Sequence, residues 1–461
     1  MSELVWLGGV ALALLAATWL WRSVRTWKDL GLCEEAAWPL LGSDPAYLLA
    51  LKPRVQFYRE VYRRNRDLGR SYVGVHTANL PSLVLLDPQL VEEVAVKLFS
   101  QFPGRSNIFP EDIRKLDPLM DNIVFACGEK WKRLRGGLTT AFSGAKLKGM
   151  EAELVECGRA LQRKVTSFAR EGRPVEVTDL VRVFAIDVIA ACGFGVRVDA
   201  TSGNDSQFAR MACRAAAPSF KRKTWAALRT LFPPLTDIFR ISFLESEVQR
   251  FFLKVATDTV NIRESETRDK VDFLQLLLNI KRNDGGFILL NFINTSMDDN
   301  DIAANLFIFF IAGFETTSSA ISFCLYELSL NPYVQERLRR EVIDALGAQL
   351  QNINYESLKG ISYLNQVIAE TLRMYPTVPM FSRKSSKPCK IPGIDALLPA
   401  GCRVDIPIHA IHYDPQYYPE PDRFDPDRFE GSNPKNVPKG AYIPFGYGPR
   451  KCIGDYYDYT I

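Results

Sequence analysis

The sequence predicts a mainly α-helical domain with small β-sheets, placed behind a single N-terminal transmembrane helix. Three observations support this fold class. Residues 4–21 form an uncharged apolar run, residues 72–86 alternate in the manner of β-strands, and much of residues 128–281 has the apolar spacing of amphipathic helices. A second long apolar segment, residues 296–330, has no polar face through its middle, so it is expected in the centre of the domain.

The composition excludes several classes of protein. Of 461 residues, 47% are hydrophobic and the formal net charge is only +4, unlike a disordered chain. The nine cysteines are too sparse for a disulfide scaffold, and no two are spaced as a C-x-x-C zinc pair. The near balance of charge also argues against a nucleic-acid-binding protein, so no nucleic-acid partner is expected.

The N-terminal run is predicted to be a transmembrane signal-anchor, residues 1–21. As a helix, its uncharged part would be about 27 Å long, close to the hydrocarbon thickness of a bilayer. Arg22, Arg25 and Lys28 follow the run, so the rest of the chain is expected on the cytosolic side. A cleaved signal peptide is the alternative, but its positive charges should precede the apolar run. We expect a linker over residues 22–45 and one domain over residues 46–461.

The second half of the domain is predicted to contain three helices and a long loop. An S-x-x-D pattern at residues 296–299 predicts the start of the central helix, and Asn331-Pro332 predicts its end. A charged helix should then run to about residue 346, and another should cover residues 362–374. Residues 414–449 are rich in proline and glycine and predict an irregular, ordered loop.

The decapeptide FGYGPRKCIG, residues 445–454, is the strongest candidate for a chemical site. Its glycines and proline predict a tight loop, and Cys452 follows two cations at a point where a helix could begin. Cationic neighbours and a helix N-terminus both favour a thiolate, which is a good ligand for a soft or borderline metal, including haem iron. A glycine-rich turn with an incidental cysteine is the alternative.

The central helix carries two residues that are unusual in an apolar segment. Glu315 and Thr316 lie in AGFETT, residues 312–317. A buried acid is costly unless it is paired or used, and a threonine hydroxyl can bond back to the carbonyl one turn earlier. A kinked core helix would explain the same residues.

Two further pairs of residues each share a helix face. Glu370 and Arg373 are spaced i, i+3, as in an ordinary surface ion pair. Trp131 and Arg135 are spaced i, i+4, which also suits an amphipathic basic helix on the surface.

Together these segments resemble the cytochromes P450, the haem-thiolate monooxygenases. The decapeptide matches the family's haem-binding loop, F-x-x-G-x-R-x-C-x-G, at every fixed position. The resemblance extends from the anchor to Gly454 and implies the cytochrome P450 fold. The segments DPLMDN, AGFETTSSAISFCLYELSLNP and YPEPDRFDPDRF are most similar to microsomal animal members, of an arthropod branch that oxidises foreign lipophiles.

The resemblance implies a role for each candidate residue. Cys452 would be the axial ligand of the iron of haem b, in a loop that also contains Phe445 and Gly448. Thr316 would hold dioxygen and Glu315 would help to supply protons, while Ala312 and Gly313 would leave room for oxygen and substrate. The residues expected to contact the haem propionates are Trp131, Arg135, Arg450 and Arg383.

In the family, E-x-x-R is a structural pair that locks to a downstream arginine. Glu370 and Arg373 would form this pair here. The downstream motif occurs twice, as Pro-Asp-Arg-Phe at residues 421–424 and 426–429. The position just before the final loop favours Arg428 over Arg423.

The implied function is insertion of one oxygen atom from O2 into a lipophilic substrate. Electrons would come from NADPH through a flavoprotein reductase, with cytochrome b5 as an optional second donor. A basic patch would attract an acidic donor; its expected members are Lys130, Lys132, Arg133 and Lys451. Pocket walls are expected from residues 102–125, 220–244, 307–316 and 377–381. The implied location is the endoplasmic reticulum membrane, with the catalytic domain facing the cytosol.

The C-terminal segment departs from the family pattern. Family members continue for several dozen residues after the cysteine, whereas this sequence ends at Ile461, and the residues from Asp455 do not resemble the family's next helix. The alternative function is therefore that of a catalytically inactive, truncated isoform that binds a ligand or a redox partner at the membrane.

Overall fold

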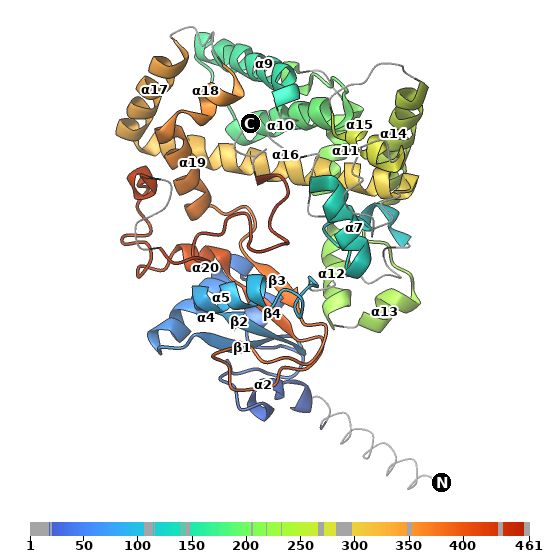
Figure 1. Cartoon of the computed structure of the whole chain (residues 1–461), viewed down its shortest axis with the longest axis vertical. Coiled ribbons are helices and arrows are strands. Elements are labelled where there is room, and N and C mark those ends of the chain that lie inside the picture. The colour runs from blue at the N-terminus through green and yellow to red at the C-terminus, as the bar shows by residue number, and fades with distance from the viewer. Residues whose placement is uncertain are drawn as a thin grey trace.

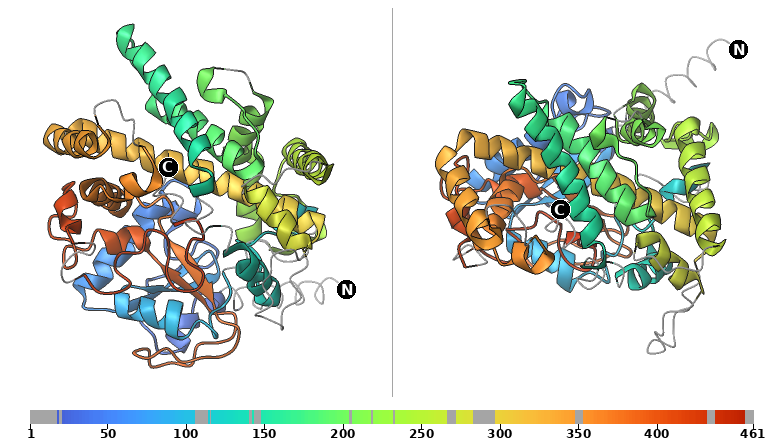
Figure 2. Two further views of the ribbon diagram at one scale, coloured as in Figure 1. Left: turned by 45° about the horizontal axis from the view of Figure 1, so that its top comes forward. Right: turned by 90° about the horizontal axis from the view of Figure 1, so that it is seen from above.

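The long apolar segment forms the central helix of the helical half of the molecule (Figures 1 and 2). This helix, α16 (Asp299–Leu330), packs along α10 (Val177–Phe194). It also contacts α14 (Ser246–Ser265), α15 (Phe273–Arg282) and α19 (Ser362–Met374). It begins one residue after Asp298, whose carboxylate accepts a hydrogen bond from the Asp301 N–H. The predicted cap, Ser296, lies outside the described residues.

The fold comes from a computed structural model, which describes residues 18, 21–105, 114, 116–139, 142, 148–203, 206–217, 219–231, 233–265, 272–282, 297–347, 353–431 and 437–455. The predicted anchor, residues 1–21, lies almost entirely outside this range. In the described part, the chain is mainly helical with one small mixed sheet, which confirms the predicted fold class for the domain.

Other helices surround α16. The predicted charged helix is α17 (Pro332–Leu346), and the predicted helix at residues 362–374 is α19 (Ser362–Met374). The remaining helical elements of this half are η2 (Pro118–Met120), α7 (Gly128–Thr139), α9 (Glu151–Arg170), η4 (Ala200–Ser202), α11 (Gln207–Ala216), α12 (Phe220–Leu231), α13 (Pro233–Ile238), α14 (Ser246–Ser265), α15 (Phe273–Arg282) and α18 (Tyr355–Lys359).

The sheet half is built on four strands in the order β1-β2-β4-β3. The predicted strand segment is a hairpin, in which β1 (Tyr72–Thr77) is antiparallel to β2 (Leu80–Leu85). β2 pairs in parallel with β4 (Arg403–Ile406), which is antiparallel to β3 (Phe381–Lys384). The short elements of this half are α2 (Thr26–Asp29), α3 (Pro45–Leu48), α4 (Arg54–Asp67), α5 (Pro88–Glu92), the π-helical turn η1 (Glu93–Lys97), α20 (Ile408–His412) and η5 (Pro426–Phe429).

The region predicted as a linker packs onto this sheet. Trp27 of α2 is 1% exposed, and its ring occupies the space that a side chain at Gly74 of β1 would need. The Cys33 thiol donates to the Tyr72 carbonyl at 3.0 Å. Close packing therefore begins before residue 46.

The two halves have separate hydrophobic cores. One core centres on α10 and α16, and the other lies between the sheet, α4 and α20. Among the described helices, α16 is long and apolar enough to cross a membrane by length and composition alone. Its contacts with α10, α14 and α19 place it in the protein core instead.

Candidate functional site

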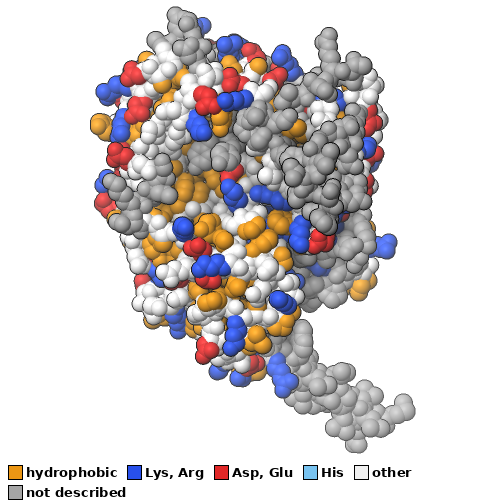
Figure 3. Space-filling view, viewed as in Figure 1, with side chains coloured by type: hydrophobic (Ala, Val, Ile, Leu, Met, Phe, Trp, Pro, Cys, Tyr) orange, Lys and Arg blue, Asp and Glu red, His pale blue; other side chains and the backbone are white. Residues whose placement is uncertain are grey.

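A cavity of about 940 Å³ is lined by side chains from both hydrophobic cores. Each of the four segments predicted to form pocket walls contributes to this lining. The lining includes Phe309 and Ala312 of α16, and Met380 and Phe381, where β3 begins. On the face seen in Figure 3, basic and hydrophobic side chains gather where the helical half meets the sheet half.

Cys452 lies in the cavity wall, at the end of a loop whose backbone is tightly held. Its N–H donates to the Phe445 carbonyl at 2.8 Å, and Phe445 also lines the cavity. Gly448 has a φ of +78°, and a Cβ added there would lie 1.9 Å from the Ala95 carbonyl oxygen in η1. Gly448 therefore shapes the loop against η1 and is not itself part of the cavity lining.

Four arginines converge on the cavity near Cys452; we call them the inner arginine cluster. Its members are Arg105, Arg135, Arg383 and Arg450. Each donates to a backbone carbonyl, at Arg450, Lys451, Tyr447 and Ala126 respectively, over 2.9–3.2 Å. The Arg450 guanidinium also lies 4.3 Å from the ring centroid of Trp131. The family resemblance implied that Trp131, Arg135, Arg383 and Arg450 contact the haem propionates, and all four line this one cavity.

The inner arginine cluster has no carboxylate partner in the part of the chain that the structure describes. Burial, together with the charges of Arg105 and Arg450, lowers the pKa of Arg383 to about 9. Burial and the charge of Arg105 lower the pKa of Arg450 to about 10. The Nε atoms of both side chains and Nη1 of Arg450 are buried and have no acceptor. Such a set of donors is stabilised by a ligand that carries two or more negative charges.

Thr316 of α16 lines the cavity, whereas its neighbour Glu315 does not. The Thr316 hydroxyl donates to the Ala312 carbonyl at 2.6 Å, one turn earlier. Burial raises the pKa of the Cys213 thiol on α11, and the negative charge of Glu315 raises it further. The residues of α16 that line the cavity recur every four positions, as at 308/309, 312/313, 316/317 and 320/321, so Glu315 falls on a different face of the helix.

Gly313 also lines the cavity, but its missing side chain is explained by packing. A Cβ at this position would lie 2.7 Å from Cδ1 of Ile189 on α10. We expected Gly313 to leave room for oxygen and substrate. In the structure, the space that its side chain would fill is occupied by Ile189.

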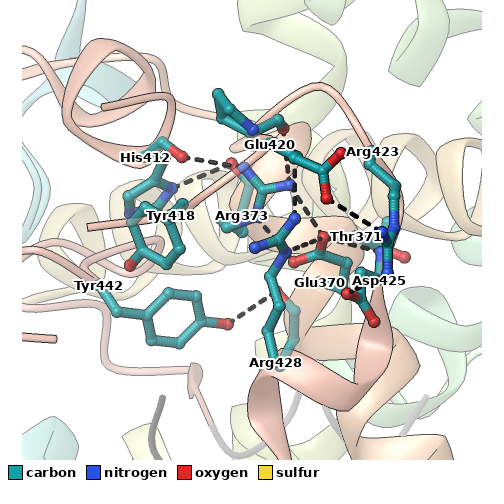
Figure 4. Close-up of polar contacts among 12 residues, drawn as sticks. Glu370, Thr371, Arg373, His412, Tyr418, Glu420, Arg423, Asp425, Arg428 and Tyr442 are labelled. Atoms are coloured by element: carbon teal, nitrogen blue, oxygen red, sulfur yellow. Dashed lines mark hydrogen bonds and ion pairs between the residues drawn. The ribbon is translucent and has the colours of Figure 1, made fainter. Parts of the chain in front are cut away.

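Glu370 and Arg373 of α19 form a fully buried ion pair (Figure 4). Two hydrogen bonds, of 2.7 and 2.9 Å, join the guanidinium to the carboxylate. Arg373 also donates to the carbonyls of His412 and Pro421 at 2.9 and 2.8 Å. Since His412 Nε2 accepts the Ile443 N–H at 3.0 Å, the pair is connected to the chain that leads to Cys452.

The structure distinguishes between the two Pro-Asp-Arg-Phe copies. Arg428 of η5 donates from Nε to Glu370 at 3.3 Å, and its side chain is only 11% exposed. Arg423 instead pairs with Glu420 and Asp425, and its side chain is 60% exposed. Arg428 is thus the arginine that lies against the buried pair, as its position in the sequence predicted.

The profile of the cytochrome P450 family matches residues 37–456 of the chain. The chain belongs to the cytochrome P450 family. It is 37% identical over 395 residues to the probable cytochrome P450 6a13 of Drosophila melanogaster. The aligned residues cover 86% of this chain and 77% of that relative. It is 33% identical to cytochrome P450 6j1 of Blattella germanica, over 94% of this chain and 84% of the relative. The resemblance to arthropod members is confirmed.

Arg105 is the member of the inner arginine cluster that sequence reasoning missed in this P450. It belongs to none of the family motifs and follows Gly104 in a short Pro-Gly-Arg segment. The backbone bridge between Gly104 and Lys384 holds this segment beside β3, close to Arg383. Only this long-range pairing brings Arg105 to the cavity.

The basic patch expected on this P450 consists of cations that already have acidic partners. Lys130 and Arg133 of α7 both bind Asp301 at the start of α16, at 2.7 and 3.2 Å. Lys132 pairs with Glu129, and Lys451 pairs with Asp455. The Lys130 and Arg133 pairs join α7 to α16, which is a structural role.

Proposed function

We propose that this P450 is a membrane-bound, haem-dependent monooxygenase of lipophilic substrates. The observation that carries the proposal is the inner arginine cluster, with buried donors lacking acceptors, next to a cysteine in the wall of the same cavity. Haem b has two propionate groups, and four arginines suit two carboxylates because each guanidinium can bind two oxygens. Trp131 would pack beside these groups through its contact with Arg450.

Cys452 would hold the haem by binding its iron through the thiolate. When bound, haem would activate dioxygen. The electrons would come from NADPH through a reductase. One C–H bond of the substrate becomes C–O–H, and the other oxygen atom leaves as water with two protons and two electrons. The protein's own contribution is to orient the sulfur, to hold the propionates and to exclude bulk water with the apolar walls.

Thr316 is the residue that we propose to assist oxygen binding. Its hydroxyl oxygen remains available as an acceptor at the cavity wall, since its proton is donated to the Ala312 carbonyl. Glu315 lies outside the wall, so any proton that it supplies would have to pass through intervening groups such as water.

We further propose that the chain acts at the endoplasmic reticulum membrane, with the domain in the cytosol. The apolar run at residues 4–21 and the cations that follow it support this location. Foreign lipophiles are the expected substrates, and a flavoprotein reductase, with or without cytochrome b5, is the expected electron donor.

A haem titration of the purified full-length chain tests the proposal. We expect stoichiometric haem binding and, after reduction and addition of carbon monoxide, the red-shifted Soret band of thiolate ligation. Cys452→Ser should abolish this band, whereas Cys33→Ser should leave it unchanged, since Cys33 lies in the sheet half. A band of neutral ligation in the unmodified chain would contradict the assignment of Cys452. Turnover of 7-ethoxycoumarin with reductase and NADPH then tests activity separately.

A further inference from the structure

The nine cysteines of this P450 lie in different surroundings. In six of them, burial raises the pKa of the thiol, and such thiols react slowly at neutral pH. These six are Cys33, Cys157, Cys213, Cys324, Cys389 and Cys402. Cys192 is only 1% exposed, and Cys452 would be occupied by the haem iron. The ninth cysteine, Cys127, lies just before α7.

Cys127 is at the N-terminal end of α7 and directly behind the cavity wall. Its carbonyl accepts the Trp131 N–H at 3.3 Å, which closes the first turn of this 12-residue helix. Its thiol donates to the Phe125 carbonyl at 3.7 Å. Phe125 lines the cavity, whereas Cys127 is outside the lining and is partly exposed. Solvent therefore reaches Cys127 without passing through the cavity.

Arg450 is a buried cation that lies against Cys127. Its Nη2 donates at 2.9 Å to the carbonyl of Ala126, the residue before Cys127. Burial lowers the pKa of Arg450 to about 10, and contact with the Cys127 side chain acts in the opposite direction. Arg450 is 2% exposed, and its Nε and Nη1 find no acceptor in the part of the chain that the structure describes. Such a guanidinium stabilises a negative charge placed beside it.

Two other features favour negative charge at this position. Burial lowers the pKa of Arg105, and the negative charges of Cys452 and Cys127 oppose this change, so Arg105 is within electrostatic reach of both sulfurs. The N-terminal end of α7 also carries partial positive charge from its backbone N–H groups. The nearest acid in the sequence, Glu129, already pairs with Lys132 at 2.8 Å. An anionic molecule is therefore attracted to the surroundings of Cys127.

A cysteine in such surroundings can exchange with a disulfide. Cys127 would lose its proton to water, and its sulfur would attack one sulfur of the reagent. The S–S bond of the reagent breaks as a new S–S bond forms to Cys127. The other half of the reagent leaves as a thiolate and takes up a proton. Cys127 is oxidised and the leaving half is reduced, so the exchange needs no further oxidant.

We propose that Cys127 is a site of reversible thiolation by small anionic disulfides, the class that glutathione disulfide represents, and that this modification weakens haem retention. Arg450 would bind a haem propionate and lies against Cys127 at the same time. An anionic group attached to Cys127 would compete with the propionate for this guanidinium. Only the effect on haem rests on the proposed function.

Mass spectrometry of tryptic peptides from the full-length chain in neutral detergent tests the site. The probes are dithiodipropionate, which is anionic, and cystamine, which is cationic. Each rate is divided by the rate at the same cysteine in the urea-unfolded chain, which removes the intrinsic difference between the reagents. We expect dithiodipropionate to modify Cys127 about tenfold faster than Cys157, whose pKa is raised to about 11 by burial and by nearby acids. At Cys127, cystamine should be the slower reagent.

Variants test the roles of Arg450 and of the haem. Arg450→Gln should slow the reaction of Cys127 with dithiodipropionate about tenfold, the value of one charge-assisted contact. Arg339→Gln, at an exposed arginine that pairs with Glu336, is the control and should not change this rate. In the haem-loaded chain, dithiodipropionate should raise the rate of haem transfer to apomyoglobin about tenfold. Cys127→Ser should abolish this effect, and Cys157→Ser should retain it.

Several results would overturn the proposal. Equal normalised rates for the two reagents at Cys127 would do so, as would modification of Cys157 at the rate of Cys127. Unchanged haem transfer after complete thiolation would refute the link to Arg450. The comparison of reagents uses the unmodified chain, so it does not depend on whether Arg450→Gln folds. Because thiolation is measured on peptides and the Soret band is recorded separately, failure of this proposal can be distinguished from failure of the proposed function.

Discussion

The two Pro-Asp-Arg-Phe copies provide a matched test of what stabilises the loop before Cys452. Removal of Arg428 takes away its charge-assisted bond to Glu370 and its 2.8 Å bond to the Glu420 carbonyl. Glu370 is fully buried but keeps Arg373 and the Asp425 N–H as donors. We therefore expect Arg428→Ala to cost about 2–4 kcal/mol, below the upper range for breaking a buried ion pair.

Arg423→Ala is the control, because it removes the same side chain from the same tetrapeptide. The Arg423 side chain is 60% exposed and that of its partner Glu420 is 71% exposed, so the expected cost is below about 1 kcal/mol. The assay is urea unfolding of the haem-loaded chain, with midpoints compared at equal m-values. Equal costs for the two variants, or a cost below about 1 kcal/mol for Arg428→Ala, would refute the reasoning.

Three further predictions concern the loop and the cavity. Gly448→Ala should lower the haem content of the purified protein, because the added Cβ would overlap the Ala95 carbonyl. Gly431→Ala is the control and should retain haem, because Gly431 has a similar φ but open space around it. Arg450→Gln should raise the rate at which haem transfers to apomyoglobin about tenfold, the value of one charge-assisted contact. Arg339→Gln, at an exposed arginine, is the control and should leave this rate unchanged. Burial lowers the pKa of His412 to about 3, below its unfolded value of about 6.5. The neutral ring therefore stabilises the fold above about pH 6.5, and this stability should fall as the pH drops toward 3. His412→Gln should reduce the slope of unfolding free energy against pH in that range, and an unchanged slope would contradict the role of His412.

Local sequence patterns were enough to locate the central helix, the two helices that follow it and the first strand segment. The bounds of α19 and α17 follow from apolar periodicity together with proline at or after the ends, which are local properties of the backbone. The cysteine loop was identified in the same way, since its glycines supply backbone conformations that other residues rarely adopt.

Tertiary structure was needed wherever a side chain finds a partner far away in the sequence. Arg105 reaches the cavity through the bridge between Gly104 and Lys384, and no local pattern indicates that pairing. The two Pro-Asp-Arg-Phe tetrapeptides are identical, so position in the chain favoured Arg428, but only the structure shows that Arg428 is buried and Arg423 exposed. Tertiary packing likewise decides which face of α16 lines the cavity, so that Thr316 belongs to the lining and Glu315 does not.

The sequence by itself determined the central helix, the two helices after it, the strand segment at residues 72–86 and the family, because periodicity and turn residues act over a few positions. Only the tertiary structure decided which cations share a cavity and which of them find an acid. Charge interactions depend on distance and burial in space, so the inner arginine cluster emerges only when the two halves of the fold are brought together.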